Sequence, residues 1–127
     1  MQLIDELKEE HKALFKLISK IKSSTGNPAS RSGLLLELKT LIMEHLKKED
    51  SRLYPVLNNS DDEKVKKISY NFTRGMERIS TIIIRFFQKH ERNPDDMRFS
   101  SDFSKIIQLL KIRIEREEKI LFRLYKR

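Results

Sequence analysis

The chain contains no cysteine among its 127 residues. Disulfide bonds, thiolate catalysis and cysteine-ligated metals are therefore excluded. Glycine and proline are also scarce, at three residues each, so few positions interrupt regular backbone structure. Because leucine, isoleucine, lysine, glutamate and arginine dominate the rest, the composition is typical of an all-helical domain.

Long apolar runs are missing as well. No stretch approaches the roughly 20 apolar residues that span a bilayer, so we expect no transmembrane segment. The N-terminal sequence MQLIDELK is amphipathic and carries acids, unlike a secretory signal. We therefore expect a cytoplasmic protein, and the length predicts a single domain over residues 1–127.

Acidic residues are outnumbered, with 19 Asp and Glu against 27 Lys and Arg, which gives a formal net charge of +8. A basic balance favours anionic partners such as an acidic protein surface, nucleic acid or an acidic lipid surface. The net charge alone does not choose among these partners.

What is present is helical periodicity. Apolar residues recur at spacings of three and four, which marks one face of a helix packed in a bundle. We predict helices over about 3–22, about 32–57, from the boundary at 58–63 to about 90, and from Pro94 to the C-terminal region. Four long helices with short connections predict an all-α, antiparallel up-down-up-down four-helix bundle.

Local signals mark where these helices begin and end. Residues 23–30 have the composition of a loop. Ser60 and Glu63 form a capping-box pattern for the third helix, and Pro55 is expected to bend or end the second. Asn93 can cap the fourth helix with Pro94 in its first turn; a later start near Ser100 stays open.

Polar residues interrupt the apolar stripes at matching depths. The stripes of the second and fourth helices continue through Arg52 and Val56, and through Ile120. The polar residues near the helix middles, or one turn away, should meet in the bundle core; they are His11, His45, Glu49, Arg113 and Glu117. By contrast, His90 at the end of the third helix is expected to be a solvated surface residue.

A ten-residue segment occurs twice in this pattern. Residues 45–54 (HLKKEDSRLY) and 113–122 (RIEREEKILF) share the order x-apolar-x-x-Glu-acidic-x-x-Leu-aromatic. The first copy opens with His45 and the second with Arg113. If both copies face one core, they place Glu49 and Glu117 in the same layer.

The segments EHK at 10–12, EHLKKEDSRLYP at 44–55 and EEKILF at 117–122 together resemble the hemerythrin-like (HHE cation-binding) family. The resemblance covers nearly the whole chain. It implies a four-helix bundle around a two-iron site, in proteins that bind or sense oxygen, redox state or iron, or respond to nitrosative stress. It also implies metal-ligand roles for His11, His45, Glu49 and Glu117.

Three positions depart from the family pattern. Met76 and Arg113 stand where the third and fourth helices should each offer a histidine, and Ser80 stands where some members have another. A guanidinium keeps its proton and cannot ligate a cation. We therefore hypothesise that Arg113 replaces the metal electrostatically and bridges Glu49 and Glu117.

These residues leave three possible metal-binding states of the core. We expect a metal-free relic with no resident cofactor; if a metal binds, we expect iron or a single zinc. A single-metal site would use His11, His45 and Glu49 with water. A native two-iron site is the remaining alternative.

The third helix also carries excess positive charge. Between residues 64 and 92 there are eight Lys or Arg and two Glu. At about 100° per residue, five of them fall within a narrow arc, which we call the basic ridge: Lys67, Arg74, Arg78, Arg85 and Lys89. The ridge is either a solvated face or a contact for an acidic protein partner. No aromatic residue is interleaved for base stacking, so sequence-specific nucleic-acid binding is not expected.

The enzyme classes find little support. The chain has no Ser/His/Asp or Cys/His arrangement and no glycine-rich phosphate loop. The expected function is a non-enzymatic regulatory or partner-binding module with a degenerate di-iron site. One alternative is a hemerythrin-like metalloprotein that binds or senses iron, oxygen or nitric oxide with an unusual ligand set. The other is a basic bundle that binds nucleic acid or anionic lipid.

Overall fold

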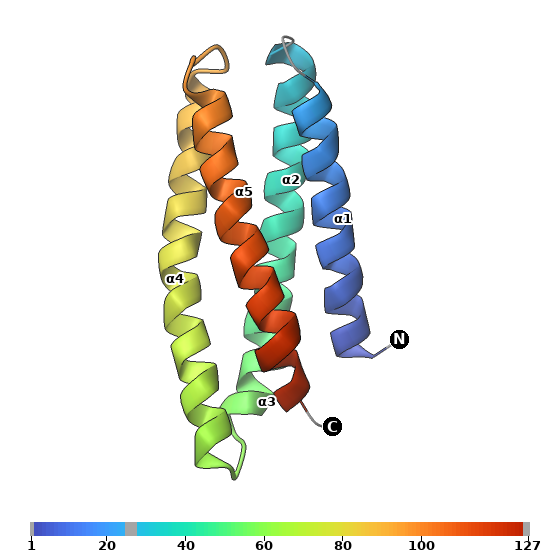
Figure 1. Cartoon of the computed structure of the whole chain (residues 1–127), viewed down its shortest axis with the longest axis vertical. Helices are drawn as coiled ribbons and strands as arrows, with labels where there is room; N and C mark the ends of the chain where they lie inside the picture. The colour runs from blue at the N-terminus through green and yellow to red at the C-terminus, as the bar shows by residue number, and fades with distance from the viewer. Residues whose placement is uncertain (1, 25–27, 126–127) are drawn as a thin grey trace.

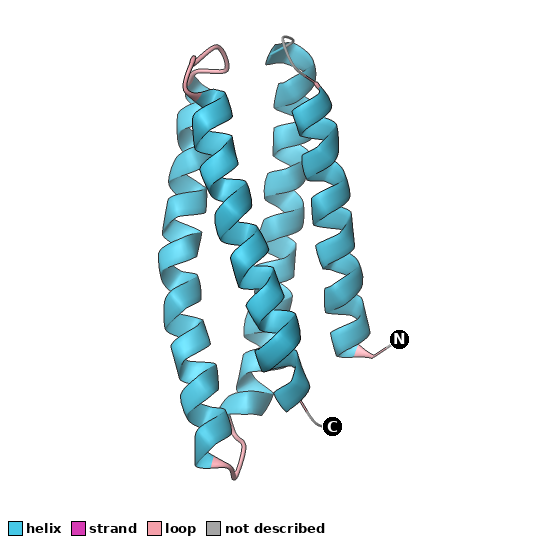
Figure 2. Cartoon of the chain, in the orientation of Figure 1, coloured by secondary structure: helices cyan, strands magenta, loops and turns pink. Residues whose placement is uncertain are grey.

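The computed structural model describes residues 2–24 and 28–125, and within them every regular element is helical (Figure 2). The elements are α1 (Leu3–Ser23), α2 (Pro28–Lys48), η1 (Glu49–Leu53), α3 (Tyr54–Asn58), α4 (Glu63–Arg92), α5 (Phe99–Arg116), η2 (Glu117–Leu121) and η3 (Phe122–Leu124). Four long helices lie side by side along the long axis of the molecule (Figure 1). The predicted all-α class is confirmed, and the arrangement fits a four-helix bundle.

The core consists of two apolar clusters. The larger cluster gathers leucines, isoleucines and phenylalanines from α1, α2, α4 and α5, including Leu38, Ile83 and Phe87. The smaller one lies toward the α3 end and includes Leu7 and Leu53. The buried polar residues His11, His45, Glu49, Arg113 and Glu117 belong to neither cluster. Along the chain His11, His45, Glu49 and Glu117 fall between buried residues of the two clusters, so a polar layer divides the core.

Two short π-helices change which residues face this core. In η1 the N–H of Tyr54 donates to the carbonyl of Glu49, five residues back. In η2 the N–H of Phe122 donates to the carbonyl of Glu117, also five residues back. Each π turn holds one residue more than an α turn, so the buried stripe moves by one position.

The stripes predicted beyond the two glutamates are therefore wrong. Val56 and Ile120 are 42% and 41% exposed, and the Arg52 side chain is 49% exposed. Leu53, Leu57 and Leu121 are buried in their place. Pro55 lies in the first turn of α3, after η1 has already changed the register. The same change in η2, which contains no proline, shows that Pro55 is not its general cause.

The helix ends differ from the predictions in two places and agree with one of two predicted starts in a third. The predicted loop at 23–30 ends early, because α2 already begins at Pro28; its residues 25–27 lie outside the described residues. Asp62, not Ser60, caps α4, since its Oδ1 accepts from the N–H of Lys64 at 2.9 Å. The helix α5 begins at Phe99, which confirms the later of the two predicted starts.

His90 is buried, so its prediction as a solvated surface residue is wrong. The residue is 2% exposed, and its ring packs against the rings of Phe86 and Phe99. Its Nε2 lies 2.9 Å from Oδ2 of Asp102. The first turn of α5 thus covers the end of α4, a contact that helix periodicity within α4 does not reveal.

Candidate metal centre

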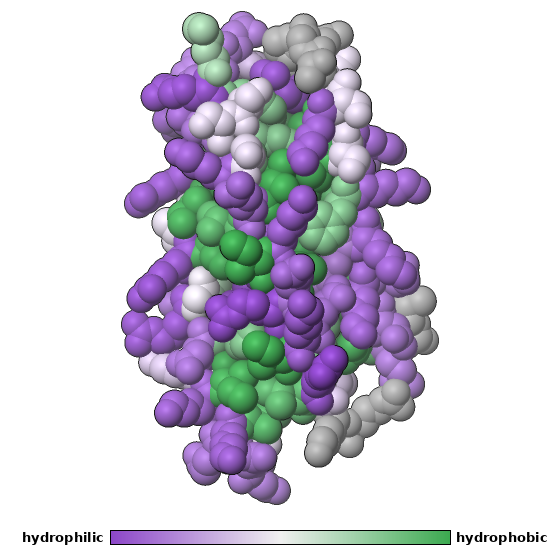
Figure 3. Space-filling view, in the orientation of Figure 1, coloured by the Kyte–Doolittle hydropathy of each residue, from purple (hydrophilic) through white to green (hydrophobic). Residues whose placement is uncertain are grey.

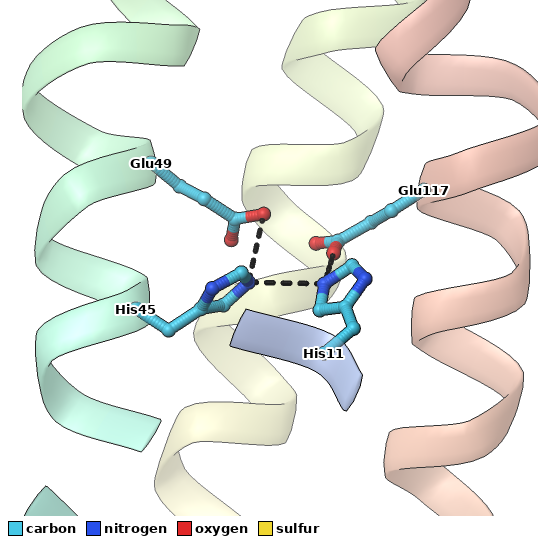
Figure 4. A group of neighbouring side chains, drawn as sticks. All are labelled: His11, His45, Glu49 and Glu117. Carbon is cyan, nitrogen blue, oxygen red and sulfur yellow. Dashed lines mark hydrogen bonds and ion pairs between the residues drawn. The ribbon is translucent and has the colours of Figure 1, made fainter. Parts of the chain in front are cut away.

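Four buried side chains from four elements converge in the polar layer (Figure 4). His11 comes from α1, His45 from α2, Glu49 from η1 and Glu117 from η2. None is more than 5% exposed. One ligand atom from each lies within 4.8 Å of all the others, an arrangement that can hold a metal ion.

The individual distances are close to those of a coordination shell. The Nε2 atoms of His11 and His45 are 3.1 Å apart. His11 Nε2 lies 3.2 Å from Oε1 of Glu117, and His45 Nε2 lies 3.3 Å from Oε2 of Glu49. In a tetrahedral site with bonds of about 2.1 Å, neighbouring ligand atoms are separated by about 3.4 Å. The other pairs of ligand atoms are separated by up to 4.8 Å, and only those pairs must move closer together when a cation is bound.

The outer nitrogen of each histidine is held by a carboxylate from another helix. His11 Nδ1 lies 2.7 Å from Oε2 of Glu118, and His45 Nδ1 lies 2.7 Å from Oε1 of Glu10. A carboxylate accepts, so each Nδ1 carries a hydrogen and the Nε2 atom of each ring is the one directed into the cluster. Histidine ligands are oriented in this way in metal sites.

Sequence reasoning missed the two orienting carboxylates, Glu10 and Glu118. Each is the sequence neighbour of a predicted ligand, His11 or Glu117. Each nevertheless contacts a histidine on a different helix. Their acidic character next to a core residue was the available signal, but the pairing across helices depends on the packing.

Without a metal, the cluster lowers its negative charge by binding protons. Burial lowers the pKa of His45, but its contacts with Glu49 and Glu10 outweigh burial and raise that pKa to about 9. Burial and the charge of Glu117 raise the pKa of Glu49 to about 7. Burial also acts on Glu117, yet its contacts with His11 and Arg113 hold its pKa below the ordinary value.

Glu49 is the least satisfied member of the cluster. Neither of its buried carboxylate oxygens has a hydrogen-bond partner among the described residues. Its nearest cationic group is His45, with which it forms an ion pair. A buried carboxylate without hydrogen bonds is costly, and a cation at this position removes that cost.

Arg113 contacts Glu117 but not Glu49. Its Nε lies 3.3 Å from Oε2 of Glu117. One terminal nitrogen, Nη2, donates to the Tyr54 hydroxyl at 3.0 Å and to the Phe72 carbonyl at 2.5 Å. The hypothesised bridge therefore exists only on its Glu117 side, because Tyr54 and Phe72 direct the guanidinium away from Glu49.

Met76 lies outside the group of candidate metal ligands. Met76 is buried in α4 and lines a groove beside α2 together with Ser80 and Tyr54. The four-residue cluster does not include it. The two third-helix positions where the family pattern offers histidines therefore supply a thioether and a hydroxyl at this groove.

The donor set fits one cation and does not fit two. Two imidazoles and two carboxylates suit iron or zinc. A second ion would need a ligand at the Arg113 position, where a fixed positive charge already pairs with Glu117. The cluster as it stands thus favours a single-ion centre.

The basic ridge is exposed over most of its length. Lys67, Arg78 and Arg85 are exposed and have no ion pair within the described part of the chain. Arg74 lies over the ring of Tyr70. Lys89 differs, because it is only 35% exposed and pairs with Asp102 at 2.7 Å.

Comparison with known proteins identifies the family. The model of the hemerythrin HHE cation binding domain matches residues 2–125. The chain therefore belongs to the hemerythrin family of HHE cation-binding domains. No curated protein and no solved structure matches it. No helix in residues 2–24 and 28–125 is long and apolar enough to cross a bilayer.

Proposed function

We propose that this chain is a non-enzymatic regulatory module of the cytoplasm whose core binds one metal ion. The metal is iron, as the family implies, and zinc is the other ion that the donor set accepts. Its ligands are His11, His45, Glu49 and Glu117. In this proposal the helices follow the up-down-up-down order, which lets the ion connect all four segments of the bundle.

The observation that carries the proposal is the orientation of the two imidazoles. Glu118 and Glu10 hold the Nδ1 hydrogens, so the two Nε2 atoms are directed toward each other at 3.1 Å. Two lone pairs at that distance repel unless a proton or a cation lies between them. The buried carboxylate of Glu49, which has no hydrogen-bond partner among the described residues, lies beside the same point.

The metal would supply a positive charge and a site for a small ligand. The residues of this chain then have defined tasks. The two histidines and two glutamates bind the ion, while Glu10 and Glu118 orient the histidines. Arg113 holds Glu117 from its other side and limits the site to one ion.

Metal analysis of the purified full chain, with an absorption spectrum, tests this proposal. We expect about one metal ion per chain. Two irons per chain with an oxo-bridge charge-transfer band would contradict the single-ion proposal. No binding of iron or zinc after reconstitution would contradict metal binding altogether.

A matched pair of histidine variants locates the ion. His45→Ala removes a ligand and should abolish stoichiometric metal. His90→Gln changes the other buried histidine, which lies outside the cluster, and should retain it. Loss of metal from both variants to the same degree would indicate general destabilisation and not loss of a ligand.

A second candidate function is the binding of an acidic protein partner through the basic ridge. The observation that favours it is the lack of acidic partners for the exposed Lys67, Arg78 and Arg85 among the described residues. The double variant Arg74→Glu plus Arg78→Glu should abolish capture of such a partner at low salt. Unchanged capture by the charge-reversed variant would leave the ridge a solvated face.

A further inference from the structure

A small pocket opens beside Arg113, between α4 and the C-terminal end of α5 with η2. Its volume is about 250 Å³. Two arginines, Arg113 and Arg116, line it together with Asn71, Gly75, Phe72 and two isoleucines, and no acid is among the described residues that line it. Its formal charge is therefore positive.

Arg113 points one free donor into this pocket. Its Nε and Nη2 are occupied by Glu117, Tyr54 and the Phe72 carbonyl. Its other terminal nitrogen, Nη1, has no hydrogen-bond partner in the described part of the chain. The side chain is 93% buried, at 7% relative exposure, so the guanidinium is fixed and this donor is preorganised.

Gly75 keeps the space in front of that donor open. A Cβ atom at this position would lie 3.2 Å from Nη1 of Arg113. Any larger side chain on this turn of α4 would therefore crowd the guanidinium. Glycine costs roughly 1 kcal/mol in a helix interior relative to alanine, and the close approach of Arg113 gives a physical reason for its presence.

Arg116 supplies a second unpaired cation. It is exposed and has no ion pair in the described residues; its guanidinium lies over the Phe72 ring at 5.5 Å. The Arg113 guanidinium lies over the same ring at 4.6 Å. Two guanidinium groups that share one aromatic ring can both donate to one bound oxoanion.

The surroundings of the pocket add to its positive potential. Asn71 lies on α4 between two ridge residues, four positions after Lys67 and three before Arg74. Both ridge residues are exposed. On the face shown in Figure 3, hydrophilic residues separate two apolar patches along the line where α4 and α5 lie side by side. Clefts lined by one sign of charge concentrate oppositely charged solutes.

From these contacts we propose that the pocket is a binding site for a small phosphate-type oxoanion. The anion accepts from Nη1 of Arg113, from the Arg116 guanidinium and from the Asn71 side-chain amide. The pocket volume of about 250 Å³ admits a phosphate group. The site needs no metal in the neighbouring cluster, so it can be tested independently of metal content.

Isothermal titration of the full chain with inorganic phosphate at constant ionic strength tests the proposal. We expect saturable binding at one site in the millimolar range, on the order of 1 mM. In amide NMR spectra the largest shifts should occur at Asn71 and Gly75. Phosphate that does not saturate by about 10 mM, or that shifts only ridge residues, would overturn the site.

Two variants that should preserve the fold probe the two sides of the pocket. Gly75→Ala crowds Nη1 while favouring the helix, and Arg116→Gln removes an exposed charge. Each should weaken phosphate binding about tenfold, the loss expected for one charge-assisted hydrogen bond. The control Arg123→Gln changes an exposed arginine that does not line the pocket and should bind as the parent. Equal weakening by Arg116→Gln and Arg123→Gln, with Gly75→Ala binding as the parent chain, would show general charge attraction and would overturn the proposal.

A second experiment with lipid vesicles distinguishes a free oxoanion from the phosphate of a lipid headgroup. Vesicles of phosphatidylglycerol present the same phosphate chemistry on a surface. Free phosphate that competes with vesicle binding supports one shared site in the pocket. Vesicle binding without any binding of free phosphate would assign the face to a membrane surface and would overturn the small-anion proposal.

Discussion

The imidazoles of His11 and His45 face each other with their Nε2 atoms 3.1 Å apart, and a carboxylate holds the opposite nitrogen of each ring. Each Nε2 also lies near a carboxylate oxygen, His11 near Glu117 at 3.2 Å and His45 near Glu49 at 3.3 Å. Contacts with Glu49 and Glu10 outweigh burial and raise the pKa of His45 to about 9, so His45 holds a proton at neutral pH. The metal-free chain therefore uses a proton where a cation would bind.

Metal binding should release protons. A metal must displace the proton on His45 and the one held by Glu49, whose pKa values are about 9 and about 7. Affinity for zinc should therefore rise with pH from about 6 toward 9. Titration calorimetry in buffers of different ionisation enthalpy measures the protons released. An affinity that does not change with pH would contradict the protonated cluster.

The stability of the metal-free chain should change with pH in the opposite sense. Both His45 and Glu49 have folded pKa values above their ordinary values of 6.5 and 4.5. Each therefore contributes stability that is complete below its unfolded pKa and is lost as pH rises through its folded pKa.

The thermal midpoint measures this loss. Between pH 6 and pH 9 it should fall by roughly 5 °C or more without metal. Glu49→Gln no longer titrates and should flatten the profile. A midpoint that rises over this interval in metal-free protein would contradict the assignment.

The orienting carboxylates should affect metal affinity more than they affect the fold. Glu118→Gln weakens the hold on His11 Nδ1, and Glu10→Gln weakens the hold on His45 Nδ1. Loss of such partners typically costs 10- to 100-fold in metal affinity. Competition with a chromophoric chelator measures the change.

Glu9→Gln is the matched control for both carboxylates. Glu9 pairs with Lys12 on the exposed surface of α1. Its variant should bind metal as the parent chain does. An equal loss of affinity from all three glutamines would point to net charge and not to orientation of the histidines.

The π turn in η2 can be tested with two neighbouring residues. Leu121 is fully buried, whereas Ile120 is 41% exposed. Leu121→Ala should lower the free energy of unfolding by about 2–5 kcal/mol because it leaves a cavity. Ile120→Ala should change it by less than about 1 kcal/mol. Urea denaturation measures both, and the reverse order would restore the α-helical register predicted from sequence.

Much of the candidate site could be predicted from sequence, because helical spacing shows which residues face the core and how far along each helix they lie. His11, His45, Glu49 and Glu117 fall on apolar stripes, and each histidine or carboxylate is unusual in such a position. The resemblance to the hemerythrin-like family rests on the same residues. The match over residues 2–125 confirms the family. The convergence of the four side chains then depends on how the helices pack.

The errors have a common physical origin. The stripe through Val56 and Ile120 assumed a constant 3.6 residues per turn, and a π turn breaks that assumption at each buried glutamate. The surface assignment of His90 considered only its own helix, and the bridge from Arg113 to Glu49 left out the competing partners of the guanidinium. Asp102, Tyr54 and Phe72, which decide both cases, come from other segments.

The sequence by itself determined the helical class, the polar layer and the identity of the groups in it, because periodicity and composition are local properties. It also determined that Arg113 cannot be a ligand, since a guanidinium keeps its charge in any fold. Only the tertiary structure decided which groups meet. The carboxylates that hold the histidines, the π turns and the free donor of Arg113 all arise from contacts between segments, and those contacts exist only when the chain is packed.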